Sequence, residues 1–153
     1  MGTTLADFIS RTAVCSGPDV IAWTEENAHA LCAWGIAENG GISQGNGAHW
    51  NPWDSTLYVP GAWPFNSFGP GGTEHVFNYP DEMKGIFAFL ATLHQGWVPS
   101  YAPIRAALAA GHDPWAVERA VGASVWGTGH FASVLAEVLA NPGPYMGRMV
   151  GGS

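Results

Sequence analysis

The chain has 153 residues, of which 47% are hydrophobic and 11% are charged, and its formal net charge at pH 7 is −7. This length predicts a single domain with a substantial core. Because contacts to phosphate groups depend on Lys and Arg, five basic residues argue against nucleic acid and anionic membranes as partners. The sequence has no apolar run that would span a bilayer, and no signal-peptide pattern is seen at its N-terminus.

The hydrophobic pattern predicts helices on both sides of a glycine-rich middle section. In the first part, helices are expected over residues 4–11 and 18–38, and an Asn-Gly-Gly sequence at 39–41 is expected to end the second one. In the last part, apolar stripes between Gly and Pro residues predict four more helices, over residues 81–95, 101–110, 114–121 and 131–139.

Residues 40–80 are predicted to form a long but ordered loop region, because disordered segments are poor in aromatic side chains and this one is rich in them. Short strands or a hairpin are expected at residues 57–59 and 74–79. We therefore predict a mainly α fold, with residues 1–140 as one domain and residues 141–153 as a mobile tail. A cleft between the two sets of helices is a common place for a binding site.

The cysteines and histidines do not indicate a metal centre. Cys15 and Cys32 are expected to be two buried thiols, with a disulfide between them as the alternative. The six His residues lack the spacing of metal ligands, so neither a metal nor a cofactor is predicted. Among the eight Trp residues, Trp23 and Trp115 are interpreted as core residues.

One carboxylate, Glu38, stands out because of its place at the end of the predicted helix over residues 18–38. Leu31, Trp34 and Glu38 recur at steps of three and four, so they share one mostly apolar face that points inward. Partial burial and the negative end of the helix dipole both disfavour the ionised form and raise the pKa of this carboxyl group. A carboxylic acid that stays protonated near neutral pH suits general acid catalysis, whereas a solvated helix end is the simpler interpretation.

The residues around this helix end also carry a family resemblance. The sequence AWGIAENGG at residues 33–41, followed by NPWDST at residues 51–56, resembles a lysozyme-like domain of phages of actinobacteria and of related bacterial proteins. In that family a helix ends in Glu-x-Gly and is followed by Asn-Pro-Leu-Asn-Thr-Thr. Further matching segments come in the same order, so the resemblance covers about residues 20–131; they lie at residues 60–63, 65–67, 77–80, 85–86, 104–111 and 124–129.

The resemblance implies a two-lobed, lysozyme-like helical domain of the goose type or transglycosylase type, with a long ordered loop or short hairpin region. It implies that the protein cuts peptidoglycan glycan strands with Glu38 as its acid, either from a phage virion or after release to the bacterial cell wall. The chain departs from the family at residues 53–55, where Trp-Asp-Ser replaces Leu-Asn-Thr, and in a longer loop at residues 69–75.

Two other functions remain open at this point, because a shared fold does not guarantee a shared activity. The first is a virion component of the tail or baseplate that keeps the fold for structural or wall-binding use and packs against other virion proteins. The second is a plain carbohydrate-binding module. In a structural subunit we expect the cleft to be filled, for example by Trp50 or Trp63.

The resemblance also suggests a second carboxylate that acts as nucleophile or base, and Asp54 and Glu74 are the candidates. Asp54 has an equally good interpretation as a residue that closes an Asx-turn. If neither carboxylate faces Glu38, a single-acid transglycosylase route remains, in which groups of the substrate assist.

Several neighbouring side chains are candidates for substrate binding. Asn51, Ser55 and Thr56 have the chemistry to hydrogen-bond sugar hydroxyl or N-acetyl groups, with capping of the loop as the alternative. Tyr79 is a candidate for binding substrate or orienting the acid, and a core role is equally plausible.

Two tryptophans, Trp53 and Trp126, are expected to stack on sugar rings, because flat aromatic faces match the apolar C–H faces of sugars. Thr128, which follows in the same segment as Trp126, is interpreted as a cap of the last helix.

Overall fold

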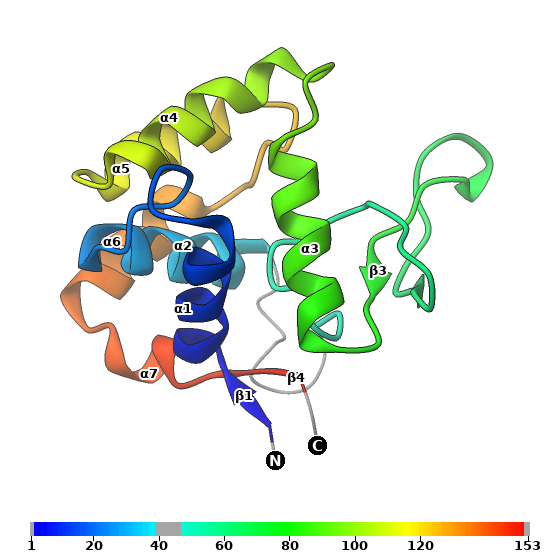
Figure 1. Ribbon diagram of the computed structural model, residues 1–153, viewed down its shortest axis with the longest axis horizontal. Helices are drawn as coiled ribbons and strands as arrows, with labels where there is room; N and C mark the ends of the chain where they lie inside the picture. The colour runs from blue at the N-terminus through cyan, green and yellow to red at the C-terminus, as the bar shows by residue number, and fades with distance from the viewer. Residues whose placement is uncertain (1, 39–46, 152–153) are drawn as a thin grey trace.

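The computed structural model describes residues 2–38 and 47–151, and these residues form a mainly helical fold, as predicted (Figure 1). The predicted end of the second helix, at residues 39–41, lies outside the described residues. The described part contains the α-helices α1 Leu5–Ser16, α2 Glu25–Glu38, α3 Glu82–Leu93, α4 Ala102–Ala110, α5 Pro114–Gly122, α6 Phe131–Ala140 and α7 Gly143–Met146. None of these helices combines the length and apolar character that crossing a bilayer requires.

Helix α2 is the centre of the core, because it is buried on every side. Its buried residues run almost without a break from Asn27 to Ile36, and α1, α5, α6 and α7 pack around it. A helix without a solvent-facing stripe is typical of the middle of a domain. Its largest buried side chain, Trp34, lies against Phe89 of α3 and Phe131 of α6, with ring centroids 5.5 and 6.3 Å apart.

Helix α2 begins at residue 25 rather than at residue 18, because a capping residue and a buried amide fix the chain just before it. The Thr24 hydroxyl accepts a hydrogen bond from the Asn27 N–H at 3.1 Å, as an N-cap residue does. The Asn27 side chain then donates to the carbonyl oxygens of Ala22 and Leu108 at 2.8 and 2.7 Å. These two bonds tie the preceding turn to the end of α4.

The other helices follow the predicted ranges, and polar caps explain where they begin. Helices α4, α5 and α6 agree within one residue, α3 is slightly shorter than predicted, and α1 extends past residue 11 to Ser16. The side chain of Asp81 accepts from the Lys84 N–H at 2.9 Å at the start of α3, and Asp113 accepts from the Trp115 N–H at 2.9 Å at the start of α5.

The loop region contains a short hairpin that lies on the far side of α3 from α1 and α2 (Figure 1). Strand β2, Trp63–Pro64, pairs antiparallel with β3, Phe77–Asn78, and a 3-10 turn, Pro70–Gly72, lies between them. The strand predicted over residues 74–79 is therefore reduced to two residues. The strand predicted over residues 57–59 is wrong, because that segment has no ladder partner and its Leu57 carbonyl instead accepts from the Tyr79 hydroxyl at 2.7 Å.

The segment after residue 140, predicted to be a mobile tail, is folded onto the domain up to residue 151. It forms α7 and then strand β4, Met149–Gly151, which pairs antiparallel with β1, Thr3–Thr4. The Val150 side chain is buried, and its carbonyl oxygen accepts from the Trp50 N–H at 3.3 Å. The two ends of the described chain therefore lie side by side (Figure 1). Residues 152 and 153 lie outside the described residues.

Trp23 and Cys15, which were predicted to be buried, are on the surface instead. Trp23 is 56% exposed, whereas Trp115 is half-buried and packs against the core. Cys15 lies on the exposed face of α1, and Cys32 is buried in α2; both thiols are free, so they do not form a disulfide. Burial raises the pKa of the Cys32 thiol to about 12.

The loop that leads into residues 51–56 rests directly on α3, at Gly85. A β-carbon added at Gly85 would lie 2.0 Å from the Trp50 carbonyl oxygen, a backbone atom that has little room to yield. The two segments can approach this closely only because residue 85 has no side chain.

We predict that Gly85→Ala destabilises the protein by roughly 1–3 kcal/mol through overpacking, although alanine is the better helix former. The matched control is Gly122→Ala in α5, where the added β-carbon meets only the Glu118 carboxylate at 3.6 Å. That variant should be neutral or slightly more stable. Urea denaturation of the three proteins measures this, and equal midpoints for Gly85→Ala and wild type would contradict the close packing.

Candidate functional site

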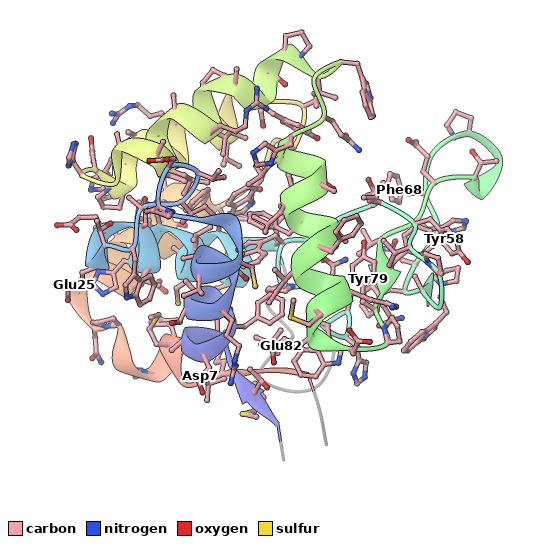
Figure 2. The ribbon with its side chains drawn as sticks, viewed as in Figure 1. Asp7, Glu25, Tyr58, Phe68, Tyr79 and Glu82 are labelled. Carbon is pink, nitrogen blue, oxygen red and sulfur yellow. The ribbon has the colours of Figure 1, made fainter. Side chains whose placement is uncertain are left out.

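A cleft of about 420 Å³ lies between the helical part and the hairpin part of the molecule. The helical part contributes Glu38, Thr92, Tyr101, Val125 and Trp126, the hairpin part contributes Phe68, Glu74 and Val76, and the segment between them contributes Asp54, Ser55 and Thr56. Figure 2 shows Phe68 on the hairpin side of α3. The cleft thus gathers residues from segments that are far apart in the sequence.

Glu38 is the last residue of α2, and it is half-buried where the apolar core meets the cleft. Burial raises the pKa of its carboxyl group above the ordinary value, while hydrogen bonds from the Thr128 and Trp126 side chains act in the opposite direction. Burial is the largest of these effects, so the predicted direction of the pKa shift is confirmed. Glu38 therefore carries a proton to higher pH than a solvated glutamate does.

The segment after α5 holds the two side chains, Trp126 and Thr128, that lower the pKa of Glu38 against the effect of burial. Trp126 is half-buried, its indole N–H donates to the Trp53 carbonyl oxygen at 3.0 Å, and its ring meets the Trp34 ring edge-on at 4.8 Å. Thr128 is buried, and its hydroxyl accepts from the Trp34 indole N–H at 2.9 Å. Trp126 lines the cleft, so its predicted place on the cleft surface agrees with the structure.

Thr128 was not recognised from the sequence as a site residue. Its interpretation as a cap of the last helix is wrong, because His130 is the N-cap of α6 and no side chain caps that helix. Gly127 has a φ of 57°, and the resulting turn brings Trp126 and Thr128 to the same carboxyl group. The only sequence signal was the short Trp-Gly-Thr run itself, which does not reveal its partner.

Asn51 builds the loop that carries the cleft residues at positions 54–56. Its side-chain nitrogen Nδ2 donates to the backbone carbonyl oxygens of Ser55 and Phe77 at 2.9 and 2.8 Å, and its side-chain oxygen Oδ1 accepts from the Ser55 N–H at 2.7 Å. Asn51 is only 2% exposed. Of the two roles predicted for Asn51, the structure therefore supports loop capping and places its side chain away from the cleft surface.

Trp53 and Tyr79 belong to the core, which corrects the substrate-binding roles expected for them. Both are 0% exposed. The Trp53 indole N–H donates to the Leu31 carbonyl oxygen at 2.9 Å, and its ring lies 4.0 Å from that of Phe89. A sugar cannot stack on a ring that is covered on all sides. The Tyr79 hydroxyl donates to the Leu57 carbonyl oxygen, so this buried residue holds the loop after residue 56 in place.

Asp54, Ser55 and Thr56 do reach the cleft, as predicted. Asp54 is half-buried and adopts a φ of 53°, in the left-handed region that Asp tolerates better than most residues. Thr56 is exposed, whereas the Ser55 hydroxyl is buried and has no hydrogen-bond partner among residues 2–38 and 47–151. Glu74 is exposed on the hairpin side of the same cleft, so both candidates for a second carboxylate share the cleft with Glu38.

The described lining of the cleft is acidic and partly aromatic. It contains three carboxyl groups and no Lys or Arg, together with the aromatic side chains of Phe68, Tyr101 and Trp126. Such a lining disfavours phosphates and other anions and suits an uncharged ligand that has both hydroxyl groups and apolar faces. In the described part of the chain, no three His, Cys, Asp or Glu residues are arranged to hold a metal ion.

We predict that Glu38→Gln stabilises the fold near neutral pH. A raised pKa in the folded state means that this residue's contribution to stability is complete below the unfolded-state pKa and is lost as pH rises through the folded-state pKa. Glutamine carries no charge at any pH, so the variant avoids this loss.

Unfolding midpoints of Glu38→Gln and wild type, measured near pH 4 and near pH 8, test this; the difference should move in favour of the variant as pH rises. The control is Glu26→Gln, which makes the same substitution at an exposed glutamate in the first turn of the same helix. If the difference in unfolding midpoint between Glu38→Gln and wild type were the same at both pH values, an ionised Glu38 would not destabilise the fold and the prediction would be wrong.

The geometry of the cleft is the basis for any functional assignment of this protein. No family model matches the chain, and no curated protein and no solved structure is significantly similar to it. A function can therefore be inferred only from the chemistry of Glu38 and its neighbours.

Proposed function

We propose that this protein cleaves the glycan strands of peptidoglycan, as a glycosidase or a lytic transglycosylase of phage type, and that Glu38 is its general acid. The single observation that carries the proposal is the half-buried Glu38 carboxyl group at the cleft, with a pKa raised by burial. When a glycosidic bond breaks, the leaving oxygen must receive a proton. A carboxyl group that stays protonated near neutral pH can donate it.

The shape and lining of the cleft support a sugar as the substrate. Its volume of about 420 Å³ falls within the range of small-ligand sites. Trp126 from the helical part and Phe68 from the hairpin part offer aromatic surface for the apolar faces of sugar rings. The exposed hydroxyl group of Thr56 lies between them and can hydrogen-bond hydroxyl or N-acetyl groups.

A lysozyme-like, two-lobed fold is part of the same proposal. In support, the acid ends a buried central helix, and the cleft separates a helical part from a part with a short hairpin. This arrangement agrees with what the sequence resemblance implies. The protein would then act on the bacterial cell wall, either from a phage virion or after release.

A virion structural or wall-binding role is the second candidate, and exposed apolar side chains favour it. Trp97 and Val125 are 79% and 74% exposed, and Met83 and Phe87 are 58% and 60% exposed. Apolar surface of this kind suits contacts with other virion proteins in a tail or baseplate. However, neither Trp50 nor Trp63 lines the cleft, so neither tryptophan fills it in the way expected for a purely structural subunit.

We expect wild-type protein to clear a suspension of purified peptidoglycan and Glu38→Gln to lose at least about 100-fold of this activity, the typical contribution of a general acid. Turbidity loss measures the effect, and Glu26→Gln, an exposed glutamate on the same helix, serves as the control with normal activity. Undiminished clearing by folded Glu38→Gln would exclude Glu38 as the acid. No clearing by folded wild type would favour the virion or wall-binding role.

We expect Asp54→Asn to reduce clearing more than Glu74→Gln, because Asp54 is half-buried in the cleft wall whereas Glu74 is exposed. The rates of both variants and the chemistry of the released sugar ends measure this. A larger loss in Glu74→Gln would assign the second carboxylate to the hairpin side. Normal activity in both, with an internal anhydro ring on the new sugar end, would indicate the single-acid transglycosylase route.

A further inference from the structure

A second cavity, of about 500 Å³, lies where α1, the start of α2 and α7 meet, and it shares no lining residue with the cleft. The side chains that give it its chemistry are Asp7, Ser10, Trp23, Glu25, His29 and Met146. Figure 2 shows Asp7 and Glu25 on the opposite side of α3 from Phe68, which lines the cleft. The cavity is therefore separate from the proposed catalytic cleft.

Trp23 contributes a partly exposed indole ring to this cavity, and the backbone on both sides of it is held in place. The Ala22 N–H donates to the Leu108 carbonyl oxygen at 3.1 Å, and the Thr24 hydroxyl donates to the Gly111 carbonyl oxygen at 2.8 Å. The indole itself is 56% exposed, so its apolar surface is open to a ligand. A ring on an anchored backbone loses little freedom when a ligand binds, which favours affinity.

The lining of this cavity is acidic, since it contains two carboxylates and no Lys or Arg. Asp7 has no ion-pair partner among the residues that the structure describes. The Glu25 oxygen Oε1 lies 3.8 Å from His29 Nε2, which is too long for a hydrogen bond. Both carboxylates can therefore accept hydrogen bonds from a ligand.

The basic side chains on the neighbouring segments contact other groups and do not neutralise the cavity. Arg11 of α1 forms an ion pair with Glu82 of α3, with 3.2 Å between nitrogen and oxygen. The Arg148 guanidinium lies 5.0 Å from the centre of the Tyr145 ring. Of the described lining residues, only His29 can become positively charged.

We propose that this cavity binds a primary alkylammonium group, of the kind that ends a lysine side chain. The three N–H donors of such a group match the carboxylates of Asp7 and Glu25 and the hydroxyl of Ser10. The Trp23 indole suits the cation through its ring face and the methylene stem through its apolar surface. Like charge disfavours an anionic ligand, and a neutral sugar gains nothing from the two charges.

The binding site does not rest on the proposed function, because none of its residues lines the cleft. A ligand held there leaves the cleft open. Both carboxylates are exposed to solvent, so we expect their attraction for a cation to weaken as salt is added.

The first test titrates the protein with Nα-acetyl-lysine N-methylamide and, at matched ionic strength, with the same compound acetylated at Nε, which keeps the stem and loses the charge. NMR follows the backbone amide signal of Ala28, a lining residue, and all measurements use one pH, so the charge of His29 stays the same. The signal should move along a saturating curve with a dissociation constant of about 1 mM, as expected for a ligand of this size. The neutral compound should bind at least about tenfold more weakly.

Matched variants separate this cavity from the general surface of the protein. Glu25→Gln should weaken binding about threefold, whereas Glu26→Gln, at an exposed neighbour outside the cavity, should leave it unchanged. Trp23→Leu should weaken binding roughly three- to fivefold through loss of the aromatic face. Its control is Trp97→Leu, at a tryptophan that is 79% exposed and lies outside the cavity.

A shift of the Ala28 signal that grows linearly without saturating, or equal affinity for the neutral compound, would overturn the proposal. Undiminished binding in the double variant of Trp23→Leu with Glu25→Gln would also overturn it, and circular dichroism confirms that this variant is folded. Displacement of the lysine compound by N-acetylglucosamine would reassign the cavity to a neutral sugar and contradict the assignment to a cation.

The source of the alkylammonium group is distinguished by a parallel titration with cadaverine, a free diamine. Tighter binding of the lysine compound than of cadaverine would support a peptide side chain as the ligand. Tighter binding of cadaverine would support a free diamine in the same site. Peptidoglycan clearing has no bearing on either result, so a failure of the proposed function and a failure of this site are distinguishable.

Discussion

The burial of α2 on every side is the constraint from which the position of the cleft follows. Nine of its fourteen residues are buried, so the helix cannot rotate about its axis without breaking the packing around it. This packing fixes the side of the core on which the last residue of the helix, Glu38, lies. The carboxyl group stands where apolar packing stops, and its burial, opposed by Thr128 and Trp126 between α5 and α6, raises its pKa.

Three tryptophans form a rigid wall behind this carboxyl group, because each of their indole N–H groups has a partner inside the protein. The acceptors are the Thr128 hydroxyl for Trp34, the Leu31 carbonyl for Trp53 and the Trp53 carbonyl for Trp126. Indoles that are hydrogen-bonded and packed in this way are held in one orientation. For the proposed cleavage of glycan strands, a wall that needs no rearrangement on binding is what electrostatic pre-organisation requires.

The helices and the inward position of Glu38 could be predicted because periodic apolar patterns report burial directly. The roles of Trp53 and Trp126 could not, because both are tryptophans in irregular segments. Only the packing decides that Trp53 lies under Phe89 while Trp126 lines the cleft. Thr128 was missed for a related reason, since its partner Trp34 is 94 positions away in the sequence. The same holds for β4, whose pairing with β1 has no local signal.

Trp50 links the cleft wall to the last strand. Its φ of 54° lies in the left-handed region, which costs a residue with a side chain about 1–2 kcal/mol, and its N–H is held by the Val150 carbonyl of β4. On the ribosome, α2 is finished long before β4 emerges, and chains fold as their segments are made. The hydrogen bond between Trp50 and β4 can therefore form only after the end of the chain has emerged, so a nascent chain has α2 and Glu38 before the loop that carries Asp54 gains this last contact.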